Sequence, residues 1–441
     1  MVQKQGSPRL VRAAIDAMKL PDLRRKVVFT LSILVIFRFI AHIPLPGINV
    51  AAMQELLGKS QLLGMLDLFS GGAMRNFSIA LMGVYPYVTA LIVMQLLTPV
   101  IPRLTALSQE GEMGRNKISR YTHWLIVPLA FLQGYGQLVI LQRGGVISGV
   151  GLSGDNLFPT ITMILTMTAG TCLIVWLGEL IDQRGIGNGV SMIIFAGIVA
   201  GLPELAGRGY VTGGENIGRL IAFIVIVLVS IVSIVIFTQA HRRIPVQYAK
   251  SSYRGGRMYR QAGSTHIPIR VNSAGMIPLI FGMSLMIFPG TVASYFIGPE
   301  TTGGFALWVQ RVFDPSGLNY DGIPYWTMYF VLVLAFTFFY TMIMFQQQNL
   351  PEVLQKQGGF IPGIRPGAAT SGYLTQVISR ITWAGAIFLA IIAIVPFIVQ
   401  KITPAMTLSS TGLVIVVGVA LDIMQQLEEQ LVMRNYEGFI K

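Results

Sequence analysis

Long runs of apolar residues, most of them near twenty residues long, recur along the chain between shorter polar segments. Runs of that length are typical of helices that cross the hydrocarbon core of a bilayer. The runs are continuous rather than alternating, which excludes a membrane β-barrel. We predict ten membrane spans, near residues 27–43, 77–97, 119–141, 157–181, 188–202, 217–238, 274–297, 324–345, 377–399 and 407–427.

One further apolar stretch, residues 62–72, is too short to be another span. As a helix it would extend roughly 16 Å, about half the hydrocarbon thickness. It ends in Gly71 and Gly72, and the polar residues Arg75 and Asn76 follow. This pattern predicts a half-length helix that enters the membrane region without crossing it and hinges on the glycine pair. We expect this helix to contact its surroundings through few residues.

Composition supports a polytopic membrane protein, and charge orients it. Hydrophobic residues make up 53% of the 441 residues and charged residues 12%, about half the charged share of a soluble domain. With residues at span ends counted in the adjoining segments, 24 of the 32 lysines and arginines fall on the side of the termini and seven on the other. Because cytoplasmic segments carry the excess of positive charge, we predict that both termini are cytoplasmic.

Ten spans divide evenly into two sets of five. We predict an N-terminal half over residues 1–211 and a C-terminal half over residues 212–441. A basic loop follows the first span of the second half, which is compatible with two repeated halves of opposite topology. Sequence similarity between the halves is too weak to establish the repeat, so periodicity alone leaves it open.

Side chains with catalytic or metal-binding chemistry are scarce in the apolar runs. No predicted span has a carboxylate at its centre, and the four histidines lack the spacing of a metalloprotease or of a nucleophile with a paired histidine. The single cysteine, Cys172, lies inside an apolar run, which excludes a disulfide framework and argues against a zinc site. We therefore expect no enzyme activity, no metal and no cofactor.

Two pairs of branched aliphatic residues have helical spacing inside predicted spans. Val84 and Val88 share one face of the second span, and Val190 and Ile194 share one face of the fifth. From periodicity alone, packing in the core or against lipid is the favoured explanation of both pairs.

Two predicted cytoplasmic segments have unusual composition. Residues 241–271 contain seven lysines and arginines, no acidic residue and three interleaved tyrosines. This composition suits a polyanionic partner such as RNA, acidic lipid or an acidic protein, although charge that only sets topology is the alternative. In the second segment, residues 358–367, proline–glycine pairs on both sides of Arg365 predict turns that hold this arginine at an exposed tip.

Several long blocks, in order along almost the whole chain, resemble the SecY family, the channel subunits of the bacterial protein-conducting translocon. The blocks are "IPLPGI" (43–48), "FSGGA" (69–73), "PYVTALIVMQLLTP" (86–99), "EGEMGRNKISRYT" (110–122), "WLGELIDQRGIGNGVSMIIFAGIVAGLP" (176–203), "RRIPVQYAK" (242–250), "STHIPIRVNSAGMIP" (264–278) and "GFIPGIRPG" (359–367). So many ordered blocks are far more specific than one short motif.

The resemblance implies an all-α polytopic membrane protein, with ten transmembrane helices in two inverted pseudo-symmetric five-helix halves around a central hourglass pore. It identifies residues 62–72 as a short re-entrant plug helix in the outer funnel, whose plug and hinge residues are Leu62, Leu66, Leu68, Phe69, Gly71 and Gly72.

The resemblance also places a pore ring at Val84, Val88, Val190, Ile194, Ile280 and Ile415. A collar of branched aliphatics offers no hydrogen bonds to a passing chain, and it dewets and resists ions when closed. The valines are smaller than the isoleucines that the family often has there. Tyr85, beside the ring, is a further departure that the resemblance does not explain.

A lateral gate for signal sequences follows from the resemblance as well, between spans two and three and spans seven and eight. Its residues are Thr89 and Gln95 opposite Asn272 and Ser284, and weak polar contacts would allow this seam to part. Cytoplasmic loops at about 239–271 and 346–376 would dock the ribosome, through its RNA, or the SecA motor ATPase. The docking residues are Arg242, Arg243, Arg254, Arg257 and Arg365.

The implied function is that of the central subunit of a channel in the bacterial plasma membrane. The channel would translocate secretory proteins across the membrane and insert membrane proteins laterally, with signal sequences and nascent chains as clients, SecE and SecG as small partner subunits, and membrane lipid around it. A secondary transporter of a small solute is the alternative, but it requires a polar mid-membrane pocket that the sequence lacks. An intramembrane enzyme ranks third.

Overall fold

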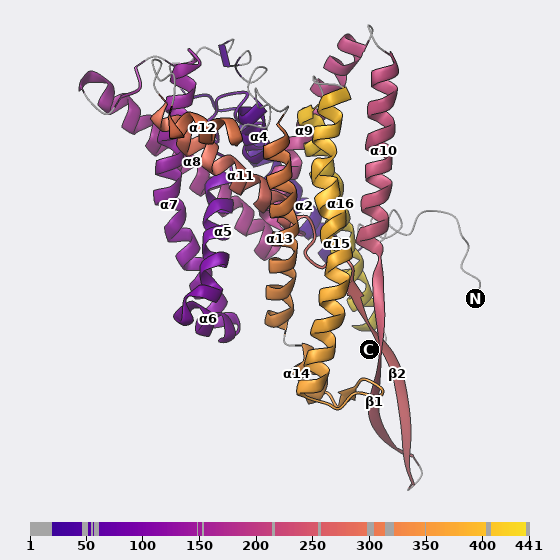
Figure 1. Cartoon of the computed structure of the whole chain (residues 1–441). Coiled ribbons are helices and arrows are strands. Elements are labelled where there is room, and N and C mark those ends of the chain that lie inside the picture. Colours follow the sequence, from indigo (N-terminus) through magenta and orange to yellow (C-terminus); the bar gives the residue numbers. More distant parts are fainter. Residues whose placement is uncertain are drawn as a thin grey trace. The chain divides into compact units, whose positions relative to one another are not determined.

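The computed structural model describes residues 20–45, 52, 53, 56, 61–147, 149–151, 154–213, 217–254, 257–297, 304–313, 322–348, 350–402 and 407–437. The described part is mostly helical and contains one small sheet (Figure 1). Contacts divide the chain into two compact units. Unit 1 comprises Met1–Val227, Met283–Thr327 and Pro396–Lys441, and unit 2 comprises Leu228–Gly282 and Met328–Val395.

Each of the ten predicted spans coincides with a helix, which confirms the helical fold class. These helices are α2 (Pro21–Ile40), α5 (Tyr85–Val100), α7 (Glu112–Arg143), α8 (Leu157–Arg184), α9 (Gly189–Gly213), α10 (Ile217–Gln239), α11 (Ile277–Phe296), α13 (Ile323–Gln348), α15 (Ala368–Ile402) and α16 (Thr407–Glu437).

Length and composition alone qualify fewer helices as membrane spans. Among the described residues, α7, α8, α13 and α15 are long and apolar enough to cross a membrane. The bent pair of α5 and α6 (Pro102–Gln109) would make a fifth span. The total of ten crossings and the two pseudo-symmetric halves, 1–211 and 212–441, stay predictions.

The second predicted span begins later than residue 77. Residues 77–84 form consecutive turns and an isolated bridge, and the helix begins only at Tyr85, with Pro86 in its first turn. Proline fits the first turn of a helix because its missing N–H would be unpaired there anyway. Most residues between 77 and 84 are apolar and buried. Apolar composition alone does not distinguish a buried turn from a helix, which explains why the predicted span began too early.

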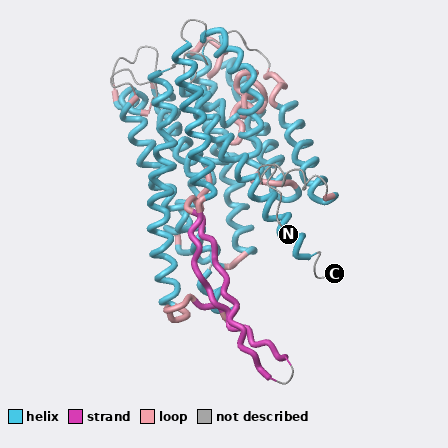
Figure 2. Tube along the Cα trace, turned by 90° about the vertical axis from the view of Figure 1, so that its right-hand side faces the viewer, coloured by secondary structure: helices cyan, strands magenta, loops and turns pink. Residues whose placement is uncertain are grey.

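The basic loop predicted at 239–271 is an ordered β-ribbon (Figure 2). Strand β1 (His241–Arg254) pairs antiparallel with β2 (Arg257–Arg270), in register from His241 opposite Arg270 to Arg254 opposite Arg257. A two-residue strand, β3 (Gly359–Phe360), adds to the other edge of β1 at Gln247 and Tyr248. Both segments were predicted as loops, so this sheet differs from the prediction.

The remaining elements of unit 1 include the helix predicted at 62–72. Helix α4 (Gln61–Ser70) packs against α5, α9 and α16. Around it, α5 packs on α7, α7 on α8 and α8 on α9. A short helix, α12 (Phe305–Val312), lies between α11 and α13 in the chain.

Candidate functional site

Helix α4 is the predicted plug helix, and the glycine pair ends it in a hydrogen-bonded motif. The Gly72 N–H donates to the Asp67 carbonyl at 3.0 Å and the Gly71 N–H donates to the Leu68 carbonyl at 3.2 Å. Both glycines have positive φ, 65° and 81°. This pairing is the Schellman arrangement, in which a glycine beyond the helix end satisfies the last carbonyls. The glycines therefore hold one conformation here, and their use as a hinge stays a prediction.

Backbone packs directly on backbone at both ends of this turn. A Cβ on Gly197 of α9 would overlap the backbone of Gly71, so the two glycines approach without any side chain between them. A Cβ on Gly83 would likewise overlap the backbone of Phe69 and Ser70. Such close approach leaves no room for larger residues, which explains why glycine occupies these positions.

A buried polar network surrounds the end of α4. The Arg75 Nε donates to Asp67 Oδ2 at 2.7 Å, and the Asp67 side chain is only 5% exposed. Ser70 Oγ lies 3.2 Å from Asp67 Oδ1 and accepts the Met74 N–H at 3.1 Å. Arg38 of α2 donates from Nη1 to the Gly71 carbonyl at 3.1 Å. Pairing makes a buried carboxylate tolerable, since an unpaired charge in such a place is costly.

Side chains of the plug helix reach three further helices. Met65 Sδ accepts the Tyr325 hydroxyl of α13 at 3.3 Å, and the rings of Phe69 and Tyr85 have centroids 5.6 Å apart. Leu68 lies beside Gly412 of α16. The expectation that this helix contacts its surroundings through few residues is therefore wrong. A mostly apolar stretch of eleven residues could not by itself reveal which surfaces would meet it.

All the predicted plug residues whose side chains are described lie inside unit 1. Leu66 and Phe69 are buried and Leu68 is partly buried. The side chain of Leu62 lies outside the described residues, although its backbone belongs to α4.

The six predicted ring residues are all buried: Val84, Val88, Val190, Ile194, Ile280 and Ile415. Five belong to unit 1 and Ile280 belongs to unit 2. The Val84 N–H donates to the Phe69 carbonyl at 3.2 Å, so the plug helix reaches the first ring position directly.

The plug helix also lies one turn from two other ring positions. A Cβ on Gly412 would lie 2.9 Å from Ile198 Cγ2 and 3.5 Å from Leu68 Cδ2. Ile198 is one turn beyond Ile194 and Gly412 is about one turn before Ile415. Val190 instead lies toward α8, since a Cβ on Gly178 would be 3.6 Å from its Cγ2. A closed ring of all six side chains stays a prediction.

Of the predicted gate residues, Thr89 is hydrogen-bonded within α5 and to α7. Thr89 Oγ1 donates to the Tyr85 carbonyl at 2.9 Å and accepts Gln133 Nε2 of α7 at 3.2 Å. The buried Ser284 hydroxyl has no hydrogen-bond partner within the described part of the chain. Gln95 is partly buried on α5. That Thr89 and Gln95 lie opposite Asn272 and Ser284 across a gate stays a prediction.

The fourth gate residue, Asn272, belongs to unit 2. Its Nδ2 donates to the Gly275 carbonyl at 3.1 Å, while its Oδ1 is buried without a partner among the described residues.

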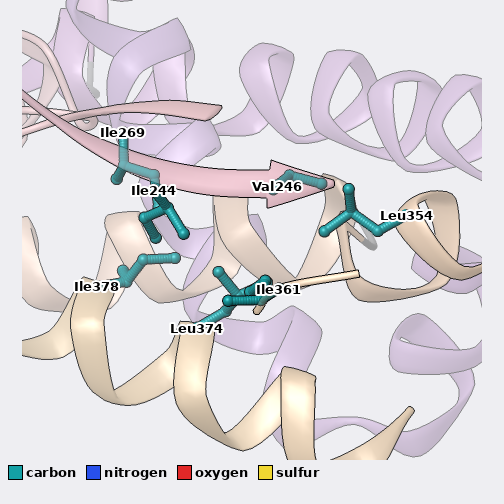
Figure 3. Close-up of a cluster of buried hydrophobic side chains, with 7 residues drawn as sticks. All are labelled: Ile244, Val246, Ile269, Leu354, Ile361, Leu374 and Ile378. Carbon is teal, nitrogen blue, oxygen red and sulfur yellow. The ribbon is translucent and has the colours of Figure 1, made fainter. Parts of the chain in front are cut away.

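The two predicted docking loops share one hydrophobic cluster in unit 2 (Figure 3). Its side chains come from the ribbon, from α14 (Leu350–Lys356), from the turn after β3 and from α15. The buried members are Ile244, Val246, Ile269, Leu354, Ile361, Leu374 and Ile378. We call this cluster with β1, β2, β3, α14 and the turn at 361–367 the docking platform. That the two loops form one structure is not predictable from either segment alone.

Arg365 occupies the exposed position that the turn residues predicted. Gly363 and Gly367 on either side have φ of 84° and 103°, as turn glycines do. The Thr370 hydroxyl donates to the Arg365 carbonyl at 2.9 Å, and the neighbouring Ile364 packs against the hydrophobic cluster. The backbone below the guanidinium is thus anchored, while the side chain is exposed.

The other docking arginines lie on the ribbon. Arg242 and Arg243 are exposed near its base, and Arg243 Nε lies 3.3 Å from His241 Nε2. Arg254 and Arg257 are opposite each other at the far end of the pairing. The side chains of these last two lie outside the described residues.

Several residues at these sites were missed from the sequence. Gln133 and Gln137 stand four residues apart in an apolar run and are both buried, so polar residues on one helix face were an available signal. The resemblance did not explain Tyr85, and the structure shows that it is buried and packs on Phe69. Gly197 and Tyr295 had no signal in the sequence, because only contacts distant along the chain distinguish them from other glycines and tyrosines.

Comparison with known proteins supports the arrangement described above. Residues 78–424 match the SecY family. The chain is 41% identical over 447 residues to the protein translocase subunit SecY of Streptomyces lividans, across 98% of this chain and all of that protein. It is 42% identical over 449 residues to the protein translocase subunit SecY of Halalkalibacterium halodurans, with the same shares covered.

Solved structures share the fold at lower sequence identity. One described as "The structure of a protein conducting channel" matches with a TM-score of 0.65 and 17% identity, over 95% of this chain and 96% of that chain. Another, "Sec61 in the Canine ribosome-channel complex from the endoplasmic reticulum", matches with a TM-score of 0.62 and 18% identity over the same shares. At these identities the likeness shows the fold.

Proposed function

The chain belongs to the SecY family, and from this premise we propose how its parts serve a protein-conducting channel. It is a membrane-embedded channel subunit of a protein translocase and not an enzyme. Its substrates are secretory proteins that cross the membrane and membrane proteins that enter it. A small-solute transporter is not favoured.

The plug helix seals the resting channel at the aliphatic ring. The observation that carries this proposal is the hydrogen bond from the Val84 N–H to the Phe69 carbonyl, which joins the first ring position to the last turn of α4. Leu68 approaches α9 and α16 one turn from Ile194 and Ile415. An apolar ring with an apolar helix beside it offers ions no hydration and therefore resists their passage.

A reversible lock on the plug helix tests the seal. The side-chain ends of Met65 and Tyr325 are 3.3 Å apart. Cysteines at both positions, in a Cys172→Ser background, can therefore be joined by a short bifunctional reagent that forms a reducible disulfide bond with each thiol. We expect the cross-linked channel in vesicles to import no signal-bearing client and to recover after reduction. The Met65→Cys and Tyr325→Cys single variants, treated identically, control for modification. Undiminished import by the fully cross-linked channel would overturn the plug assignment.

The proposed lateral gate lies where α5 and α7 meet α11. Buried polar groups that are poorly paired support it, because the Ser284 hydroxyl and the side-chain oxygens of Gln133 and Asn272 have no hydrogen-bond partner in the described part of the chain. Such a seam is less stable than an apolar one, and an entering apolar signal helix can compete with it. Gln95 and Asn272 are assigned to the same gate.

The docking platform binds a large polyanionic partner. Residues 241–271 contain no acidic residue, and the shared hydrophobic cluster keeps the ribbon and the Arg365 turn in one fixed structure. In the 346–376 loop the other cation, Lys356, lies 3.8 Å from Glu352. RNA phosphates and the carboxylates of a protein partner such as the SecA motor both present anionic oxygens, which an arginine fork contacts bidentately.

Charge reversal at Arg365 tests this docking surface. A charge-assisted contact contributes about 1.5–3 kcal/mol, so Arg365→Glu should slow partner-driven import roughly tenfold or more. Arg365→Lys should lie between Arg365→Glu and the parent. Arg380→Glu, an exposed arginine on α15 away from the turn, is the matched control. Parental import by Arg365→Glu, at equal channel content, would refute the docking role.

We assign the chain to the bacterial plasma membrane, with both termini cytoplasmic. The charge bias between the two sides supports this orientation. SecE and SecG are the proposed small partner subunits. Exposed apolar residues on α2 and α10, for example Val35 and Val229, supply surface for partner helices or lipid.

A further inference from the structure

Tyr85 lies at the junction of the plug helix and the proposed gate, and the seal and the gate as described above leave it without a role. Its side chain is 1% exposed. Its ring packs against Phe69 at a centroid distance of 5.6 Å and an interplanar angle of 49°. The residue before it, Val84, is hydrogen-bonded to the Phe69 carbonyl. Residues 83–85 therefore touch the last turn of the plug helix through backbone and ring together.

The other end of the Tyr85 side chain faces α11. Its phenol lies near the phenol of Tyr295 and the hydroxyls of Thr89 and Thr291, and both Tyr295 and Thr291 are on the part of α11 that belongs to unit 1. The Tyr295 ring in turn lies against Gly136 of α7, where a Cβ would overlap the ring. Tyr85 thus contacts the plug helix at one end and, at the other, the seam at which α11 meets α5 and α7.

The two phenol hydroxyls at this seam are poorly satisfied. The hydroxyl oxygens of Tyr85 and Tyr295 are both buried, and neither makes a well-formed hydrogen bond in the described part of the chain, although the hydroxyls of Thr89 and Thr291 lie near that of Tyr85. A buried hydroxyl without a partner destabilises the state that buries it, relative to a state in which water reaches it. The closed seam is therefore stabilised by ring packing and destabilised by the same two side chains' hydroxyls.

We propose that Tyr85 is a positioning residue that couples parting of the gate to release of the plug helix. This inference rests on the proposed channel function and names how its gate and seal communicate. When α11 moves away from α5 and α7, Tyr295 and Thr291 leave the Tyr85 phenol and water reaches its hydroxyl. The ring is then free to turn from Phe69, and the last turn of α4 loses its aromatic contact.

Substitutions at Tyr85 separate the ring from the hydroxyl. Tyr85→Leu removes the aromatic pair, so resting ion leak and export of a client with a defective signal should both rise, by roughly two- to tenfold. Tyr85→Phe keeps the ring and removes the unpaired hydroxyl, so leak should stay at the parental level while export of the defective-signal client falls below it. Tyr87→Leu is the matched control, since Tyr87 packs on His123 instead, with centroids 6.3 Å apart. It should leave both readouts unchanged.

A gain of export by Tyr85→Leu does not arise from misfolding, which only lowers export. A second measurement tests the coupling itself. We compare the changes in resting ion leak caused by Phe69→Leu and by Tyr295→Leu with the change caused by both together. With Tyr85 present, the two single changes should not add up to the change in the double variant. In the Tyr85→Leu background they should add up. Additivity in both backgrounds, or equal behaviour of Tyr85→Leu and Tyr87→Leu, would overturn the coupling. If Tyr85→Leu does not insert, the Tyr85→Phe export result decides in its place.

The parent protein separates this failure from failure of the proposed function. If parental vesicles import no signal-bearing client, the channel assignment itself is wrong. If they import normally while the Tyr85 variants behave like the parent, the channel assignment stands and only the coupling is rejected.

Discussion

The plug helix and the docking platform are held in place by different kinds of contact. The end of α4 is fixed by glycine backbones, an ion pair and a few ring or sulfur contacts. The platform is held by seven buried branched aliphatic side chains and by strand pairing. Directional contacts break one at a time and re-form with water or new partners, whereas a buried aliphatic cluster resists stepwise opening. The first kind suits an element that must move and the second suits a fixed support for partners.

The largest effect should follow from a cavity in the platform. Leu354 is 5% exposed and its neighbour Val353 is 42% exposed. We expect Leu354→Ala to lower the local stability of the platform by about 2–5 kcal/mol, and Val353→Ala by less than about 0.5 kcal/mol. Hydrogen exchange of the β1 amides measures the difference. Resting leak should be unchanged in both variants, and a rise in leak from Leu354→Ala would break the comparison.

A methyl group between the plug helix and α9 should have the next largest effect. Gly197→Ala forces Gly71 away, whereas a Cβ on Gly201, one turn further along α9, lies 3.9 Å from Arg75 Nη1 and fits. Both substitutions raise helix propensity equally, so their difference isolates the overlap. Overpacking of this kind lowers the stability of the packed state by about 1–3 kcal/mol. The resting conductance of Gly197→Ala should therefore be at least about five times that of Gly201→Ala. Equal conductance would show that the Gly71–Gly197 contact does not hold the seal.

Breaking the ion pair in the plug helix should have a smaller effect. Asp67→Asn keeps the shape and removes the charge that faces Arg75 and Arg38. Because the Arg75 side chain is 31% exposed, we expect a loss of about 1 kcal/mol, or roughly fivefold in leak. Adding Arg75→Gln should restore part of the seal, since it removes the uncompensated charge. Leak that rises further in the double variant would contradict this account.

The smallest effect should come from one cation on the ribbon. Arg257 is one of several arginines in residues 241–271, so we expect Arg257→Glu to weaken partner binding by only about 0.2–1 kcal/mol. The difference in partner binding between Arg257→Glu and the parent should become smaller as the salt concentration rises, because salt screens exposed charges. Binding to the ribosome or to SecA at two salt concentrations measures it. A loss as large as that of Arg365→Glu would show that the ribbon, not the turn, dominates docking.

Much of the helical fold could be predicted from the sequence. The ten apolar runs each coincide with a helix, and the eleven-residue stretch is a short helix that ends at the two glycines. The exposed Arg365 between two turn glycines was also predicted. These features depend on residues near one another in the chain, where periodicity and turn chemistry act directly.

The ribbon was missed although local signals were present. Ile244, Val246 and Tyr248 alternate with polar residues, and Gly255–Gly256 separates two long segments, as in a two-residue hairpin connection. The high charge and Pro245 are unusual within a strand, so these local signals are weak when the segment is considered alone. Pairing with β3, more than a hundred residues away, is not visible in either segment alone.

The sequence by itself determined the membrane class, the helices and the family, because apolar run length and ordered motifs are properties of the chain. Only the tertiary structure decided that Gly71 meets Gly197, that Asp67 is buried with Arg75, that Tyr85 joins Phe69 to Tyr295 and that both docking loops share one core. The physical reason is the same in each case. These contacts join segments far apart in the chain, and their strength depends on close approach and burial, which exist only after the helices have packed.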